Sequence, residues 1–170
     1  MPCFPMFVDL KGKRILVLGG GKVALRKVKK LQPFGGKITV VAPRVEPELE
    51  AIPGLEISRH PFRLSDLWPR PELVIAATDD RQVNARAARL CRRHRIPVNV
   101  ADDGSDSSFL FPALVERGDF CAGISTGGDS PTAAVYFKER FEELIPERLE
   151  EILRFLDGKR EELKKTLPDQ

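Results

Sequence analysis

The sequence predicts an α/β fold: a doubly wound, Rossmann-like parallel sheet, followed by a small α+β region and C-terminal helices. The run Ile15–Leu18 is short and continuously apolar, as expected of a central strand that is covered on both faces. A glycine turn and a helical pattern follow it, and a second apolar run, Ile38–Val41, comes next. Strands then alternate with helices for about 100 residues, which is typical of a doubly wound sheet.

The first predicted strand ends in a glycine turn with the spacing G-x-G-x-x-A, formed by Gly19, Gly21 and Ala24. In dinucleotide-binding turns these positions serve the tight turn, the close approach of backbone to pyrophosphate, and helix–strand packing. Apolar residues at helical spacing from Val23 to Leu31 predict a helix whose N-terminal N–H groups point at a phosphate. Ordinary turns also contain glycine, but the strand before this turn and the helix and strand after it favour a dinucleotide site.

The remaining elements complete the sheet and then depart from it. In chain order we expect a helix at Glu46–Ile52, strands at Leu55–His60 and Leu73–Ala77, a helix at Val83–His94 and a strand at Val98–Ala101. An antiparallel hairpin over Ser107–Val115 and Phe120–Ser125 is predicted next, followed by helices over Thr132–Leu144 and Pro146–Leu163. The chain is thus expected to have a nucleotide-binding domain over 1–106, a middle region over 107–145 and a C-terminal helical segment over 146–170.

Composition limits the function classes. With 42% hydrophobic residues the chain can bury a core, and a net charge of +3 with mixed signs predicts no nucleic-acid partner. No apolar run approaches the roughly 20 residues of a membrane span, and the first residues lack the features of a signal peptide, so a cytoplasmic location is expected. The three cysteines and two histidines show no metal-ligand spacing, so no resident metal is expected.

Candidate site residues follow the strands, because ligands of open doubly wound sheets bind beyond the carboxyl ends of the strands. The predicted fold brings together Gly19–Val23, Ala42–Arg44, Thr78–Asp80 and Asn99–Asp103. The second strand is followed by Arg44, whereas a dinucleotide site usually has an acidic residue there to hold the ribose. Arg44 can stack on adenine, meet the 2′-phosphate of NADP or simply be exposed in a turn.

Carboxylates and small residues supply the other candidates. Asp102 follows a strand and can exchange a proton beside a cofactor, although Asp and Gly at 102–104 also suit a plain turn. Asp79 and Asp80 equally fit the N-cap of the next helix. The loop Ser125–Pro131 begins a helix, and it can bind substrate carboxylates through its N–H groups or act only as a capped helix entry.

Together these segments resemble the precorrin-2 dehydrogenase family, which includes the N-terminal module of siroheme synthase. The resemblance covers nearly the whole chain. Its segments are PMFVDLKGKRILVLGGGKVALRK, ITVVAP, VIAATDDRQVN, IPVNVADD, SSFLFPALVERG and ISTGGDSP. Their order and spacing make the resemblance more specific than a glycine turn alone.

The resemblance implies oxidation of precorrin-2 to sirohydrochlorin with NAD as cofactor, and in some members insertion of ferrous iron to give siroheme. Asp102 matches the family's acid/base aspartate and becomes a candidate for a transient iron contact. Family members form homodimers through the region that corresponds to 107–145, and the segment 146–170 is short compared with stand-alone members. The expected cofactor-binding residues are Gly19, Gly21, Lys22, Val23, Pro43, Arg44 and Thr78, and the expected substrate-binding residues are Ser125, Thr126, Gly127, Gly128 and Ser130.

Two other functions stay open on the residues alone. One is a chelatase that keeps the nucleotide fold but has lost dehydrogenation, against which the intact glycine turn argues. The other is a regulatory, nucleotide-sensing Rossmann domain. A sensing module would need neither Asp102 nor the loop Ser125–Pro131, so their presence favours the enzyme.

Overall fold

The computed structural model describes residues 3–101 and 104–166, and within them the chain forms two compact units. The first unit is Met6–Leu110, and the second comprises the described residues of Met1–Pro5 and Phe111–Gln170. No helix of the described residues is long and apolar enough to cross a bilayer.

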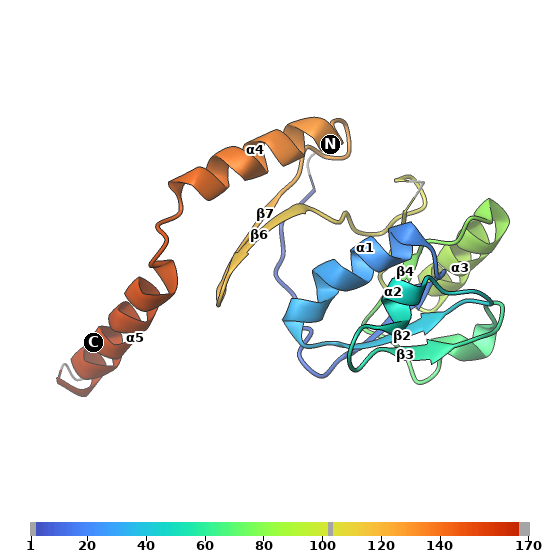
Figure 1. The fold of residues 1–170 in the computed structure, drawn as a ribbon, viewed down its shortest axis with the longest axis horizontal. Helices are drawn as coiled ribbons and strands as arrows, with labels where there is room; N and C mark the ends of the chain where they lie inside the picture. Colours follow the sequence, from blue (N-terminus) through green and yellow to red (C-terminus); the bar gives the residue numbers. More distant parts are fainter. Residues whose placement is uncertain (1–2, 102–103, 167–170) are drawn as a thin grey trace. The chain divides into compact units, whose positions relative to one another are not determined.

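The first unit contains a five-stranded, fully parallel sheet with the strand order β3-β2-β1-β4-β5 (Figure 1). This order confirms the predicted doubly wound sheet, with the switch in winding direction between β1 and β4. Side chains of Ile15–Leu18 in the central strand are fully buried, as their apolar run predicts. The strands are β1 (Arg14–Leu18), β2 (Lys37–Val41), β3 (Glu56–Ser58), β4 (Leu73–Ala76) and β5 (Val98–Val100).

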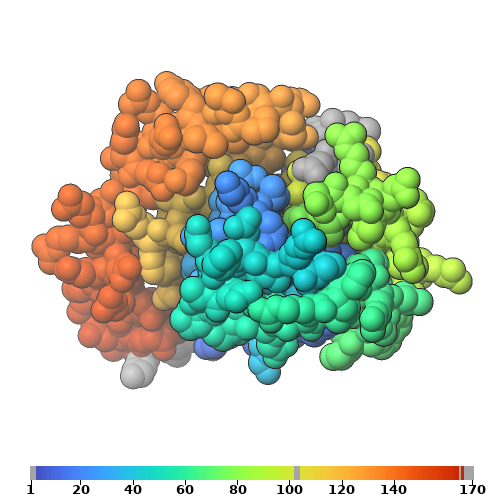
Figure 2. Space-filling model, turned by 45° about the vertical axis from the view of Figure 1, so that its right-hand side comes forward, coloured from blue at the N-terminus to red at the C-terminus, as the bar shows by residue number. Residues whose placement is uncertain are grey.

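Helices cover both faces of this sheet. The helices are α1 (Lys22–Leu31), α2 (Pro47–Glu50) and α3 (Arg81–Arg93). Leu16 and Leu18 pack in one cluster with Ala87 and Cys91 of α3. Right-handed crossovers put α1 on the opposite face, where its apolar stripe is buried. On the surface drawn in Figure 2, the cyan and green residues from β2 to β4 border the yellow-green α3.

The second unit consists of a hairpin and two helices, as predicted. Strands β6 (Ala113–Arg117) and β7 (Phe120–Ile124) pair antiparallel, with Val115 opposite Ala122. Helix α4 (Pro131–Leu144) packs on both strands (Figure 1). Phe120 stacks on Phe141 with ring centroids 6.3 Å apart. Helix α5 (Leu149–Thr166) follows.

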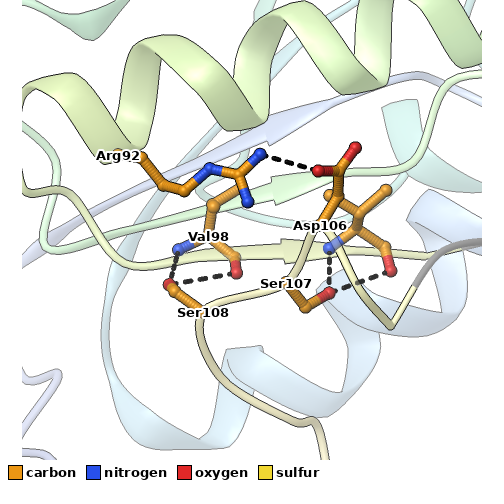
Figure 3. Close-up of polar contacts among 6 residues, drawn as sticks. Arg92, Val98, Asp106, Ser107 and Ser108 are labelled. Carbon is orange, nitrogen blue, oxygen red and sulfur yellow. Dashed lines mark hydrogen bonds and ion pairs between the residues drawn. The ribbon is translucent and has the colours of Figure 1, made fainter.

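The predicted extended segment Ser107–Val115 is wrong in its first half, because β6 begins only at Ala113. Ser107 and Ser108 instead line the open edge of β5 (Figure 3). The N–H of Val98 donates to Ser108 Oγ and that of Val100 donates to Ser107 Oγ, both at 2.8 Å. Each hydroxyl also lies 3.3 Å from the carbonyl oxygen of the same valine, to which it donates. The serine side chains thus replace the hydrogen bonds that a sixth strand would make.

We expect the double substitution Ser107→Ala and Ser108→Ala to lower the free energy of unfolding by about 2–6 kcal/mol, since each lost partner leaves a buried N–H unsatisfied at about 1–3 kcal/mol. Urea unfolding measures this change. Ser65→Ala, at an exposed serine of the same unit, is the control and should shift stability by less than about 0.5 kcal/mol. Equal stability of the double variant and the control would show that the β5 edge does not depend on these hydroxyls.

Candidate functional site

A cavity of about 850 Å³ opens in the first unit beyond the carboxyl ends of β1, β2 and β4. Its wall combines the glycine turn, the segment after β2, the segment after β4, the first residues of α3, and Ala101 after β5. All seven residues predicted to bind the cofactor line this cavity, namely Gly19, Gly21, Lys22, Val23, Pro43, Arg44 and Thr78. The sheet therefore gathers segments that are far apart in the sequence, as the strand order requires.

The three glycines of the turn have different surroundings. Gly19 has a φ of +107°, and a Cβ there would lie 2.2 Å from the carbonyl oxygen of Ala77. A Cβ on Gly20 would lie 2.1 Å from the carbonyl oxygen of Arg44. A Cβ on Gly21 would have no neighbouring heavy atom within 4 Å. Gly19 and Gly20 thus allow close packing of backbone on backbone, while Gly21 leaves open space for a ligand.

Hydrogen bonds fix the turn against the end of β2 and the segment that follows it. The Gly19 N–H donates to the Val41 carbonyl at 3.0 Å. The Glu46 N–H donates to the Gly20 carbonyl at 2.8 Å, so the chain after β2 returns to the turn. The sequence predicted Gly20 only as part of the segment Gly19–Val23, and Glu46 only as the first residue of a helix. Nothing in the sequence pattern marked the contact between them.

The N-terminus of α1 is open, whereas that of α3 is capped. Gly21 provides no side-chain cap, and the first turn of α1 has no acidic residue. At α3 the Asp80 carboxylate accepts hydrogen bonds from the N–H groups of Gln82 and Val83, at 2.8 and 3.2 Å. Asp80 therefore has the N-cap role, while Asp79 does not cap and lines the cavity. The uncapped N–H groups and dipole of α1 suit the pyrophosphate of a dinucleotide.

Thr78 is held in place by Asn84, a buried polar residue that belongs to none of the predicted site segments. The Thr78 N–H and hydroxyl both donate to Asn84 Oδ1, at 3.1 and 2.7 Å, and Asn84 Nδ2 donates to the Thr78 carbonyl at 3.0 Å. These bonds fix the segment between β4 and α3 where it forms the cavity wall. An asparagine on the apolar face of a predicted helix was the available signal.

Lys27 of α1 reaches across to β5. Its Nζ donates to Asn99 Oδ1 at 3.2 Å, and Asn99 Nδ2 donates to the Phe109 carbonyl at 3.1 Å. Burial, with smaller contributions from Lys30 and Arg26, lowers the pKa of Lys27 from 10.5 to about 8. The lysine thus links the helix that begins at the glycine turn to the strand that precedes Asp102.

This lowered pKa predicts a pH dependence of stability. Between about pH 8 and 10.5 the unfolded chain binds more protons at Lys27 than the folded chain, so the free energy of unfolding should rise with pH. Lys27→Met should remove that part of the rise in urea unfolding at a series of pH values. Lys29→Met, at an exposed lysine paired with Glu48, should keep it. The same pH profile in both variants would contradict the prediction.

The predicted catalytic residue, Asp102, lies outside the described residues. The predicted substrate residues lie in the second unit, in the loop between β7 and α4. There Ser130 Oγ accepts from the Ala133 N–H at 3.2 Å, so Ser130 is the N-cap of α4. Thr126 Oγ1 donates to the Ser130 carbonyl at 2.9 Å, and Ser125 Oγ accepts from the Gly127 N–H at 3.2 Å.

Two glycines of the same loop have a left-handed backbone conformation: Gly127 and Gly128 have φ values of +72° and +95°. No heavy atom would lie within 4 Å of a Cβ at either position. Among the residues that the structure describes, no group of three or more His, Cys, Asp or Glu side chains could hold a metal ion.

Known proteins resemble the chain in sequence and in structure. A family described as putative NAD(P)-binding matches residues 6–113. The solved structure of "SirC, precorrin-2 dehydrogenase" superposes with a TM-score of 0.75 and 32% identity, over 99% of this chain and 83% of that chain. This chain belongs to the precorrin-2 dehydrogenase family.

The chain is also similar in sequence to longer curated proteins. Siroheme synthase of Thioalkalivibrio sulfidiphilus is 38% identical over 99% of this chain and 35% of its own length. Siroheme synthase of Gluconacetobacter diazotrophicus is 39% identical over 98% of this chain and 37% of its own length. The chain therefore spans about a third of the length of these relatives.

Proposed function

We propose that the chain is an NAD-dependent dehydrogenase that oxidises precorrin-2 to sirohydrochlorin in siroheme biosynthesis. The observation that carries this proposal is the match with SirC over 99% of this chain and 83% of that one. The cavity supports it, because it has the open helix N-terminus and the glycine turn that a dinucleotide needs. A chelatase-only or sensing role has no separate observation in its favour.

The residues of the cavity fit NAD, which would supply the hydride acceptor of the reaction. The space at Gly21 and the open N-terminus of α1 would hold the pyrophosphate. Pro43 and Arg44, after β2, would lie at the adenosine end. Thr78, fixed by Asn84 after β4, would border the nicotinamide half.

The oxidation removes one hydride and one proton from the substrate, so a base must receive the proton. We assign this role to Asp102, which follows β5 directly after the cavity-lining residue Ala101. The loop residues Ser125, Thr126, Gly127, Gly128 and Ser130 are proposed to bind substrate carboxylates. Gly127 and Gly128 support this assignment because they leave the backbone of the loop uncovered by side chains, while the Gly127 N–H itself donates to Ser125 Oγ.

Homodimer formation through the middle region, 107–145, is part of the proposal. Exposed apolar side chains support it: Val135, Tyr136 and Phe137 of α4 are each about half exposed, at 47%, 52% and 55%. Sedimentation at micromolar concentration should show a dimer.

Two further parts of the proposal rest on the family resemblance. One is the insertion of ferrous iron, with Asp102 as a transient contact, and the other is a cytoplasmic location.

The test of the dehydrogenase is an anaerobic assay of the purified chain with precorrin-2. NADH formation and the sirohydrochlorin spectrum are followed with NAD and then with NADP. We expect conversion with NAD, and then iron-dependent formation of siroheme when ferrous iron is added. No conversion with either dinucleotide, despite measured NAD binding, would point to a chelatase-only or sensing protein.

A further inference from the structure

The charged residues of the cavity wall are unevenly distributed over its two ends. The wall contains Lys22, Arg44, Glu46, Asp79 and Asp80. Asp79 and Asp80 follow β4, and the Asp80 carboxylate is occupied at the α3 N-cap. On the β2 side, Glu46 is the single carboxylate among the described lining residues. Residues on this side of the cavity border the half of a dinucleotide site that holds the adenosine ribose.

Glu46 is fixed closely to the glycine turn by its own backbone. Its N–H donates to the Gly20 carbonyl at 2.8 Å. The absence of a side chain on Gly20 lets Arg44 and Val45 approach the turn directly, since a Cβ would lie 2.1 Å from the Arg44 oxygen and 2.8 Å from the Val45 Cα. The chain after β2 thus turns back toward the glycine turn. This reversal brings Glu46 to the cavity, although Glu46 lies five residues beyond the end of β2.

The carboxylate of Glu46 differs from those of its neighbours in α2. Glu48 pairs with Lys29 at 3.1 Å, and Glu50 pairs with Arg59 at 2.6 Å, all of them well exposed. Glu46 is only partly exposed, and within the described part of the chain its carboxylate has no hydrogen bond or ion pair. A partly exposed glutamate in the cavity wall whose carboxylate has unused acceptor capacity suits a hydroxyl-bearing ligand.

We infer that Glu46 accepts hydrogen bonds from the adenosine ribose hydroxyls of the dinucleotide and sets a preference for NAD over NADP. The inference rests on the proposed function, since it requires a dinucleotide in the cavity. An acidic residue directly after the second strand normally holds the ribose and repels a 2′-phosphate, but here Ala42, Pro43 and Arg44 occupy that place. Glu46 supplies the carboxylate from the returning loop, and it offsets the attraction of Arg44 for a phosphate.

The test is calorimetric titration of the purified chain with NAD and with NADP. Glu46→Gln should weaken NAD binding about tenfold, because a hydrogen bond to a charged acceptor is replaced by one to an amide. NADP binding should stay equal or become tighter. The ratio of the Kd for NADP to the Kd for NAD should therefore fall by about tenfold or more. Glu48→Gln, two residues away and outside the cavity wall, is the matched control and should keep the wild-type ratio.

The outcomes separate this inference from the proposed function. If the wild-type chain binds neither dinucleotide, the proposed function fails and the inference fails with it. If the wild type prefers NAD and Glu46→Gln keeps that preference unchanged, the inference is overturned while the proposed function stands. Glu46→Asp should retain a preference for NAD, and thermal unfolding of each variant checks that the fold is intact.

Discussion

Alanine at Gly20 is expected to destabilise the first unit by at least about 2 kcal/mol and to abolish measurable NAD binding. The new Cβ would lie 2.1 Å from the carbonyl oxygen of Arg44 and 2.8 Å from the Cα of Val45. Both are backbone atoms, so no side-chain rotation can relieve the overlap. Steric overpacking of this kind typically costs about 1–3 kcal/mol and sometimes more. Separation of the two segments would also break the 2.8 Å hydrogen bond from Glu46 to Gly20.

Gly21→Ala is the matched comparison, because a Cβ there has open space around it. Gly21 also has an extended backbone, with a φ of −88°, which alanine adopts without strain. This variant should unfold at the urea concentration of the wild type but lose NAD affinity at least about tenfold, since the methyl group occupies the proposed pyrophosphate space. Urea unfolding and calorimetry measure both effects. A lower stability of Gly21→Ala, or an unchanged stability of Gly20→Ala, would contradict the roles given to these two glycines.

The sheet could be predicted because each of its signals is local in the sequence. Continuous apolar runs such as Ile15–Leu18 need burial on both faces, and parallel strands covered by helices provide it. The glycine turn then predicted a ligand site at the carboxyl edge, where all seven predicted cofactor-binding residues line a cavity. Local pattern therefore determined the architecture and most of the cavity wall.

The remaining features depend on contacts between segments that are distant in the sequence. Ser107 and Ser108 precede an apolar stretch and look like the start of a strand, but their hydroxyls bond to the edge of β5. Glu46 reaches the cavity only because the chain folds back onto Gly20. Asn84 looks like an ordinary helix residue until Thr78 is placed beside it. An asparagine on an apolar helix face signals a polar contact there, but neither spacing nor composition identifies the partner in any of these pairings.

The largest effect on catalysis is expected from Asp102→Asn. An amide has nearly the size of a carboxylate but cannot accept a proton, so turnover of precorrin-2 should fall by about ten- to ten-thousand-fold. Binding of NAD should be retained, because the proposed pyrophosphate and adenosine contacts come from the glycine turn and the segment after β2. The anaerobic assay measures turnover, and calorimetry measures the Kd of NAD in the same preparation.

Asp106→Asn is the control for this result, because it removes a carboxylate from the same stretch of chain. Asp106 pairs with Arg92 at 2.6 Å in a partly exposed ion pair, and such pairs contribute little to stability (Figure 3). Its substitution should therefore leave turnover within about twofold of wild type.

Unchanged turnover in Asp102→Asn would remove Asp102 from its role as the base. Equal losses in turnover and NAD affinity would instead assign it a structural role at the end of β5. Only the selective loss of turnover agrees with a carboxylate that receives the substrate proton while the dinucleotide is held by other residues.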